Sequence, residues 1–401
     1  MSTKSTLSSQ MSTYLEKSSW IRRMFEAGTE LKKIHGQDRV YDFSLGNPDL
    51  PPPGSVGHAL SQMANEAQKP YAFGYMPNAG YPHVRQKVAE WAGPSQEANL
   101  QAEDVLLTCG AAGGLNCIFK ALLEPGEEVV CPAPYFVEYF FYAQNHGGVL
   151  RPVLAQKDDF HLDLPAMAEA ITEKTRIVLL NSPNNPTGQV YDKKELLELA
   201  RILETASRKN KRPIYLVSDE PYRFLTYEGA EVSPIFPLYA QSIVANSFSK
   251  SLSLAGERIG YLLINPSMPE KAPLMEGLVL ANRILGFVNA PAVGQRLLEE
   301  TLYSQVDVDI FVRRRELMRE VLDKAGYSYP LPRGGFYFFP AAPGGDDVAF
   351  VQALQQERIL AVPGSGFGCP GHFRLSFCVP EQVIRNSAQG FARARDNKAR
   401  E

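Results

Sequence analysis

Short apolar runs alternate with stretches of helical spacing between residues 56 and 285. Six runs have the length and composition of buried strands: residues 105–108, 128–131, 177–180, 214–217, 243–245 and 260–264. This alternation predicts an α/β fold with a mostly parallel, doubly wound sheet and helices on both faces. In open sheets of this kind, ligands bind beyond the carboxyl ends of the strands. We therefore expect the functional site at that edge.

The pattern changes on both sides of this region, which indicates a second domain. A proline-rich crossing occupies residues 46–53, and a second change follows residues 289–291. Before these limits the sequence predicts a helix over residues 14–34 and a short strand over residues 40–45. After them it predicts a long helix over residues 295–325, strands over residues 335–339, 359–362 and 373–377, and a final helix. We expect a large domain over residues 54–288. Residues 1–53 and 289–401 should combine into a smaller α+β domain.

The composition indicates a globular protein that binds a small molecule. Of 401 residues, 44% are hydrophobic, and 41 basic and 44 acidic residues give a net charge of −3. Without a basic cluster interleaved with aromatic residues, nucleic acids and anionic membranes are poor candidates for partners. Five cysteines form no Cys-x-x-Cys pair, which indicates a reducing, cytoplasmic environment. The histidines are not spaced as metal ligands, so we expect no bound metal. No run of apolar residues reaches the roughly 18 that a membrane-spanning helix needs, so we expect no membrane span.

Three consecutive predicted strands end in polar, reactive sequences. Residues 177–180 lead into Asn-Ser-Pro-Asn-Asn-Pro-Thr-Gly, residues 214–217 into Ser-Asp-Glu-Pro-Tyr, and residues 243–245 into Asn-Ser-Phe-Ser-Lys. The last of these sequences ends at Lys250, and Arg258 follows it. The pKa of a lysine amine falls readily when the amine is desolvated or lies near cations, and a guanidinium binds phosphate through a bidentate fork. The pattern suits a lysine that holds a phosphorylated aldehyde.

With its motifs in this order, the chain resembles the class I/II aminotransferases, aspartate aminotransferase-like enzymes of pyridoxal-phosphate fold type I. The resemblance extends from about residue 41 to about residue 380. It implies transfer of an amino group between an amino acid and a 2-oxo acid by a ping-pong mechanism. Lys250 would bind pyridoxal 5′-phosphate and move the substrate proton, and Asp219 would keep the ring nitrogen protonated. Tyr222 and Asn185 would hold the phenolic oxygen; Asn184 is adjacent, and the match to Asn-Pro-Thr-Gly favours Asn185.

The resemblance also implies a phosphate site. The sequence Thr-Cys-Gly-Ala-Ala-Gly-Gly lies between a strand and a helix, where small residues let backbone amides and the helix N-terminus approach an anion. The residues expected around the phosphate are Gly110, Ala111, Ala112, Ser247, Ser249 and Arg258. Tyr75 matches the residue that reaches the phosphate of the neighbouring subunit, which implies a homodimer with shared active sites.

Three further residues match positions that contact the ring or the substrate. Phe136 matches the aromatic residue whose ring stacks on the pyridine, although the aromatic cluster around it is otherwise typical of a core. Arg374, in a predicted strand, matches the residue that binds the substrate α-carboxylate. Gly46, after the first strand, would bring a backbone amide to the same carboxylate.

Other functions stay open at the level of sequence. A pyridoxal-phosphate-dependent carbon–sulfur β-lyase uses the same lysine, aspartate and arginine, but it releases pyruvate and ammonia. A sensor of amines agrees less well with a complete catalytic set and no attached DNA-binding segment. Residues 366–371 satisfy Gly-x-Gly-x-x-Gly, yet a strand follows them instead of a helix, which argues against a nicotinamide site. The amino donor is also open, because no motif assigns a second arginine, although Arg283 lies near a suitable position.

Overall fold

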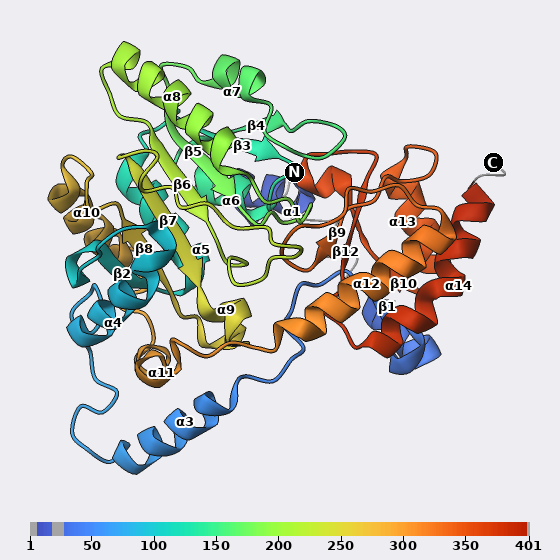
Figure 1. The fold of residues 1–401 in the computed structure, drawn as a ribbon, viewed down its shortest axis with the longest axis horizontal. Coiled ribbons are helices and arrows are strands. Elements are labelled where there is room, and N and C mark those ends of the chain that lie inside the picture. Colours follow the sequence, from blue (N-terminus) through green and yellow to red (C-terminus); the bar gives the residue numbers. More distant parts are fainter. Residues whose placement is uncertain (1–5, 18–27, 399–401) are drawn as a thin grey trace. The chain divides into compact units, whose positions relative to one another are not determined.

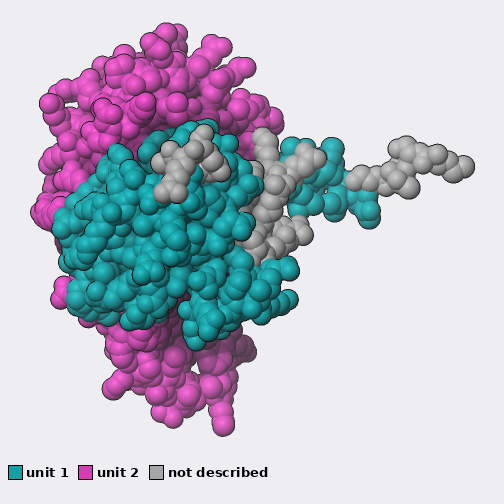
Figure 2. All heavy atoms as spheres, turned by 90° about the vertical axis from the view of Figure 1, so that its right-hand side faces the viewer, with its two compact units in different colours: residues 1–46, 310–331, 336–401 teal, residues 47–309, 332–335 magenta. Residues whose placement is uncertain are grey.

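The computed structural model describes residues 6–17 and 28–398, which divide into the two compact units coloured in Figure 2. The smaller unit combines residues up to 46 with residues 310–331 and 336–401. The larger unit consists of residues 47–309 and 332–335. The division expected at residues 288 and 289 therefore falls inside the larger unit, which also contains α11 (Ala292–Thr301).

A seven-stranded sheet forms the centre of the larger unit (Figure 1). In spatial order its strands are β2 (Val105–Thr108), β8 (Gly260–Ile264), β7 (Ser242–Ser247), β6 (Tyr215–Asp219), β5 (Thr175–Asn181), β3 (Glu128–Ala133) and β4 (Val149–Leu154). The strands from β7 to β4 are parallel, whereas β8 runs antiparallel to both of its neighbours, β2 and β7. The mostly parallel α/β sheet confirms the prediction from the sequence.

Side chains of each central strand alternate between two cores, as the two-residue period of a strand requires. In β5, Val178 and Leu180 belong to one core and Ile177 and Leu179 to the other. The first core includes α4 (Pro82–Ala92) and α8 (Lys193–Asn210), and the second includes α5 (Gly110–Leu122) and α10 (Lys271–Ile284). Burial on both faces explains why the strands read as continuous apolar runs.

Further helices and turns complete the larger unit. They are α3 (Gly54–Glu66), α6 (Glu138–Asn145), α7 (Leu164–Ala170), α9 (Phe248–Ser251) and the 3₁₀ turns Gly93–Gln96, Ala102–Asp104 and Ala255–Glu257. The long helix expected over residues 295–325 was wrong, because α11 ends at Thr301 and α12 (Val308–Ala325) begins after a break. Within that break the backbone amide of Val306 donates to the carbonyl of Ser251 instead of continuing a helix.

The smaller unit contains two small sheets. β1 (Tyr41–Asp42) is parallel to β10 (Ile359–Leu360), while β12 (Phe373–Ser376) lies between β11 (Val362–Pro363) and β9 (Tyr337–Phe338) in antiparallel pairing. The single strand expected over residues 359–362 is thus divided between two sheets.

Helices account for most of the remaining residues of this unit. They are α1 (Ser9–Lys17), most of α12, α13 (Asp347–Gln356), α14 (Glu381–Lys398) and the 3₁₀ turns Gln37–Arg39 and Gly364–Phe367. Residues 28–35 are helical, and the middle of the helix expected over residues 14–34 lies outside the described residues. No helix in the described part of the chain is both long and apolar enough to cross a membrane.

Candidate active site

The carboxyl ends of β5, β6 and β7 lie side by side at one edge of the large sheet. Asn181 pairs in register with Asp219, and Asp219 pairs with Ala245. The segment after β5 carries Asn185, and α9, directly after β7, carries Lys250. Because parallel strands end at the same edge, the three polar sequences recognised above come together there.

β8 brings Arg258 to this edge because it runs in the opposite direction. Its first residue, Gly260, pairs with Ser247 of β7 and with Thr108 of β2. Gly110, which opens α5, has a φ of 69°, and a Cβ there would lie 2.9 Å from Nη2 of Arg258. A Cβ on Gly260 would lie 2.7 Å from the carbonyl carbon of Gly110. Glycines therefore allow the N-terminus of α5 and a guanidinium to approach closely, an arrangement that suits an anion.

The two carboxylate oxygens of Asp219 have different surroundings. The hydroxyl of Tyr139 donates to Oδ2 at 2.5 Å, whereas Oδ1 is buried and has no hydrogen-bond partner among the described residues. Burial raises the pKa of Asp219 to about 7; the hydrogen bond from Tyr139 lowers it, and the charge of Glu220 raises it. A buried acceptor without a donor costs free energy. Oδ1 therefore fits a ligand that presents a protonated nitrogen.

The two adjacent asparagines of the segment after β5 have different contacts. Oδ1 of Asn184 accepts hydrogen bonds from the backbone amide and the hydroxyl of Thr187, at 3.1 and 2.8 Å, and so stabilises the turn itself. The backbone amide of Asn185 donates to Oδ1 of Asn181 at 2.7 Å, which fixes this residue next to the end of β5. The contacts support Asn185 over Asn184 as the residue that faces a ligand.

Most of the other predicted residues of the larger unit lie on the same strand-end segments. Tyr222, Ser247 and Ser249 are buried, and Ala111 and Ala112 form the first turn of α5. Phe136 precedes α6, and its ring meets that of Tyr139 edge-on, with centroids 5.6 Å apart at an interplanar angle of 86°. Phe136 is thereby linked to Asp219 through one intervening side chain.

Arg374 and Gly46 come together in the smaller unit. The buried guanidinium of Arg374 donates to the carbonyl of Ser44 at 2.5 Å and lies between the rings of Tyr337 and Phe367, 4.8 Å from each centroid. A Cβ on Gly46 would overlap the hydroxyl of Tyr337. The two residues expected to bind a carboxylate are therefore neighbours around one aromatic side chain.

Tyr75 is not part of a strand-end segment; it lies in the exposed loop between α3 and α4. Its side chain is 92% exposed, and Tyr71 and Phe73 of the same segment are 91% and 48% exposed. Three exposed aromatic residues in five positions form an apolar surface patch, which is typical of a protein interface.

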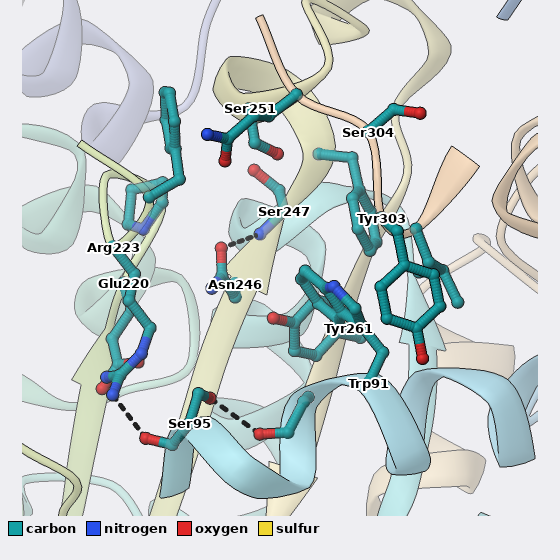
Figure 3. A pocket seen from close by; sticks show the side chains of 16 residues that line it. Trp91, Ser95, Glu220, Arg223, Asn246, Ser247, Ser251, Tyr261, Tyr303 and Ser304 are labelled. Carbon is teal, nitrogen blue, oxygen red and sulfur yellow. Dashed lines mark hydrogen bonds and ion pairs between the residues drawn. The ribbon is translucent and has the colours of Figure 1, made fainter. Parts of the chain in front are cut away.

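A cavity of about 340 Å³ adjoins the strand ends (Figure 3). Its polar lining includes Asn246, Ser247 and the ion pair between Arg223 and Glu220, in which the charged atoms are 2.8 Å apart. Its aromatic lining includes Phe248 and Tyr261 of the first core and Trp91, which packs against that core, whereas Tyr139 belongs to the second core. Asp219 and Lys250 are not lining residues, so the cavity is distinct from the group around Tyr139.

Tyr139 is the residue of this group that the sequence did not single out. It lies in a run of aromatic residues whose pattern is that of an ordinary core, and it is 1% exposed. The sequence feature that could have pointed to Tyr139 is its position three residues after Phe136, on a helix that follows a strand end. That spacing alone does not distinguish a packing role from a hydrogen bond to Asp219.

Lys250, the buried carboxylate of Asp219 and the close approach of Gly110 to Arg258 thus lie at the strand ends of one α/β sheet, where an enzyme of this class binds its ligand. Residues 38–391 match the model of the family described as aminotransferase class I and II. The chain belongs to this family, whose members use pyridoxal phosphate and move amino groups between amino acids and 2-oxo acids.

Individual relatives agree with this assignment. The aspartate/prephenate aminotransferase of Thermus thermophilus is 32% identical over 364 residues, which cover 87% of this chain and 89% of that protein. The crystal structure of an aminotransferase from Eubacterium rectale has a TM-score of 0.93 at 35% identity and covers 98% of this chain and 99% of its own. The aspartate aminotransferase of Thermotoga maritima has a TM-score of 0.85 at 28% identity, with coverage of 96% and 99%. The relatives support transamination over β-elimination.

Proposed function

We propose that this aminotransferase binds pyridoxal 5′-phosphate at the strand ends of the larger unit and transfers amino groups in two half-reactions. The observation that carries the proposal is the buried Oδ1 of Asp219, which lacks a partner among the described residues and lies on the strand edge that also carries Lys250 and Arg258. When bound, the cofactor stores the amino group and delocalises the electron pair left at the substrate Cα.

Residues of this chain hold each part of the cofactor. Asp219 accepts the hydrogen bond of the ring nitrogen, and its negative charge keeps that nitrogen protonated. Tyr222 and Asn185 bind the phenolic oxygen, and Phe136 packs on the ring. The phosphate is bound by Gly110, Ala111, Ala112, Ser247, Ser249 and Arg258. The helix N-terminus and the guanidinium both favour a dianion there.

Lys250 has two tasks in this proposal. Its amine would hold the cofactor, and once the amino-acid substrate had taken that place, the free amine would act as the base for the proton at the substrate Cα. The same amine would then carry that proton as a general acid. Its place in α9, directly after β7, puts it next to the strand that ends in Asp219.

The smaller unit supplies the substrate carboxylate site. Arg374 is held by Ser44 and by two aromatic rings, and it binds the α-carboxylate together with the backbone amide of Gly46. We propose aspartate as the first amino donor to test, because the Thermus thermophilus and Thermotoga maritima relatives are named for it.

We also propose a homodimer in which Tyr75 of each subunit reaches the phosphate of the other. The exposed aromatic patch of Tyr71, Phe73 and Tyr75 supports this arrangement, because side chains of this size are rarely left in water unless a partner covers them. A dimer of this kind contains two equivalent composite sites.

The substitution Lys250→Ala tests the proposal. We expect the purified wild-type protein to carry the absorption band of bound pyridoxal phosphate and to convert aspartate and 2-oxoglutarate into oxaloacetate and glutamate. Lys250→Ala should slow turnover by at least about 10²- to 10⁴-fold, the usual contribution of a positioned acid–base group. The exposed Lys194→Ala on α8 serves as the control and should retain full activity. Wild-type turnover in Lys250→Ala, or release of ammonia without formation of glutamate, would contradict the proposal.

A further inference from the structure

One buried side chain joins two residues that the proposed function places against the cofactor ring. Tyr139, in the first turn of α6, is 1% exposed. Its hydroxyl donates to Oδ2 of Asp219 at 2.5 Å, and the edge of its ring meets Phe136 with centroids 5.6 Å apart. Tyr139 therefore contacts both Asp219, which is expected to bind the pyridine nitrogen, and Phe136, which is expected to stack on the pyridine.

The hydrogen bond decides which carboxylate oxygen is available. A carboxylate can rotate about its terminal torsion, which is broad and nearly two-fold. With Oδ2 held by Tyr139, that rotation is restricted and Oδ1 is left as the acceptor for a ligand. Burial, followed by the charge of Asp219, raises the pKa of Tyr139 well above its ordinary value of 10, so the hydroxyl keeps its proton and acts as the donor.

This donor also affects where the proton between Asp219 and the ring nitrogen resides. Two forms compete: a charged pair with the proton on nitrogen, and a neutral pair with the proton on Oδ1. A hydrogen bond to Oδ2 stabilises the carboxylate and so favours the charged pair. Without it, a deeply buried carboxyl group is more stable in its neutral form.

We propose that Tyr139 is a positioning residue of the transamination site, which orients Asp219 by its hydroxyl and Phe136 by its ring and so keeps the cofactor nitrogen protonated. This inference rests on the proposed function. Tyr139 contacts neither substrate nor the reacting atoms; it acts through the two residues that it holds. The alternative is a tyrosine that only fills the core, for which the loss of a single hydroxyl at constant ring volume has no effect on the cofactor.

The test uses Tyr139→Phe in the holoenzyme reconstituted with pyridoxal phosphate that is ¹⁵N-labelled at the ring nitrogen. The nitrogen chemical shift reports protonation directly and does not depend on turnover. We expect the wild type to show a protonated ring, and Tyr139→Phe to shift toward the unprotonated value. The value of kcat should fall roughly tenfold, the usual effect of losing a hydrogen bond to a charged group, with little change in KM for aspartate. Tyr135→Phe, from the same segment, is the matched control and should behave as the wild type.

A second variant separates the two contacts. Tyr139→Phe keeps the ring against Phe136, whereas Tyr139→Leu loses both the ring and the hydroxyl. The induced circular dichroism of the bound cofactor should therefore persist in Tyr139→Phe and decrease in Tyr139→Leu. Thermal unfolding of each apoprotein shows whether a variant folds, and Tyr139→Phe carries the test alone if Tyr139→Leu does not.

The Asp219→Asn holoenzyme distinguishes failure of this inference from failure of the proposed function. If Asp219→Asn changes the nitrogen shift and Tyr139→Phe leaves it at the wild-type value, the role of Tyr139 is wrong and the proposed function stands. If Asp219→Asn leaves the shift unchanged, Asp219 does not hold the ring nitrogen and both proposals are wrong. A change in both variants, with none in Tyr135→Phe, supports both.

Discussion

At the scale of single residues, the burial of Asp219 makes the stability of the cofactor-free protein depend on pH. Burial raises its pKa from 3.8 to about 7, so between these values the folded protein holds a proton that the unfolded chain releases. The stabilisation is complete below about pH 4 and is lost as the pH rises through 7. At about 1.4 kcal/mol per pKa unit, the loss is on the order of 4 kcal/mol.

Urea unfolding of the apoprotein from pH 4 to pH 8 measures this effect. We expect the free energy of unfolding of the wild type to fall across this range relative to that of Asp219→Asn, which carries no titrating group at this position. The comparison cancels the contributions of all other carboxylates, since they are common to both proteins. Parallel pH profiles for the two proteins would contradict the raised pKa of Asp219.

Arg374 allows a second prediction at this scale. Its guanidinium carbon lies 4.8 Å from the centroids of two aromatic rings, and the group donates to the carbonyl of Ser44, contacts that a lysine ammonium without a planar fork cannot reproduce together. Arg374→Lys should raise KM for every amino donor by roughly 10- to 100-fold, which corresponds to the about 1.5–3 kcal/mol of a charged hydrogen bond. Cofactor affinity should hardly change. The exposed Arg393→Lys is the control, and an effect that depends on the donor side chain would instead assign Arg374 to side-chain recognition.

The residues at strand ends could be predicted from sequence because their distance from an apolar run determines where they lie. Asp219 ends β6 and Lys250 follows β7 within one turn, so the sheet itself brings them together. Tyr139 could not be predicted as part of the site, because a tyrosine in an aromatic run has the same pattern with or without a polar partner. The contact with Asp219 spans 80 residues of sequence and depends on tertiary packing.

At the scale of elements, the turn from β2 into α5 depends on Gly110. Its φ of 69° costs other residues roughly 1–2 kcal/mol, and a Cβ there would approach Arg258 to 2.9 Å. Gly110→Ala should therefore destabilise the protein and displace Arg258 from the phosphate. We expect at least about a tenfold weaker affinity for pyridoxal phosphate, measured by titration of the apoprotein, for a loss of about 1.4 kcal/mol in binding.

Gly126 offers a matched control for this substitution. It has a φ of 85°, and a Cβ there would contact nothing within 4 Å. Gly126→Ala should thus impose a similar backbone strain and reduce stability, but leave the affinity for pyridoxal phosphate unchanged. Equal affinities in the two variants would show that the space next to Arg258 is not required for binding.

A strand could be predicted where all of its side chains are buried, because it then appears in the sequence as a continuous apolar run. Six strands of the large sheet appear as apolar runs, but β4 was not recognised, since it is an edge strand with four exposed side chains and an internal proline, Pro152. The break between α11 and α12 was also missed. The helical spacing of apolar residues continues through residues 302–307. The backbone amide of Val306 nevertheless donates to the carbonyl of Ser251, a tertiary hydrogen bond that replaces a helical one.

At the scale of the whole molecule, the proposed dimer predicts that activity can be restored by mixing two inactive proteins. In a hybrid of Tyr75→Ala and Lys250→Ala subunits, one site has both an intact Lys250 and an intact Tyr75 from the partner. Random exchange makes half of the dimers hybrids with one such site each, so about a quarter of wild-type activity should return. The measurement is the aspartate assay after co-refolding. Restoration far below this level would show that Tyr75 does not serve the neighbouring site.

The antiparallel strand β8 has a consequence for synthesis of the chain. It is the last of the seven strands in sequence, yet it lies between β2 and β7, and it is the sole partner of β2 within the described sheet. β2 therefore leaves the ribosome about 150 residues before its partner, a delay on the order of 10–30 s at usual translation rates. Until then, Gly110 and Arg258 cannot meet. A nascent chain would therefore gain the part of the proposed phosphate site formed by Gly110 and Arg258 only after β8 has paired with β2, while residues 265–309 of the same unit are still to be added.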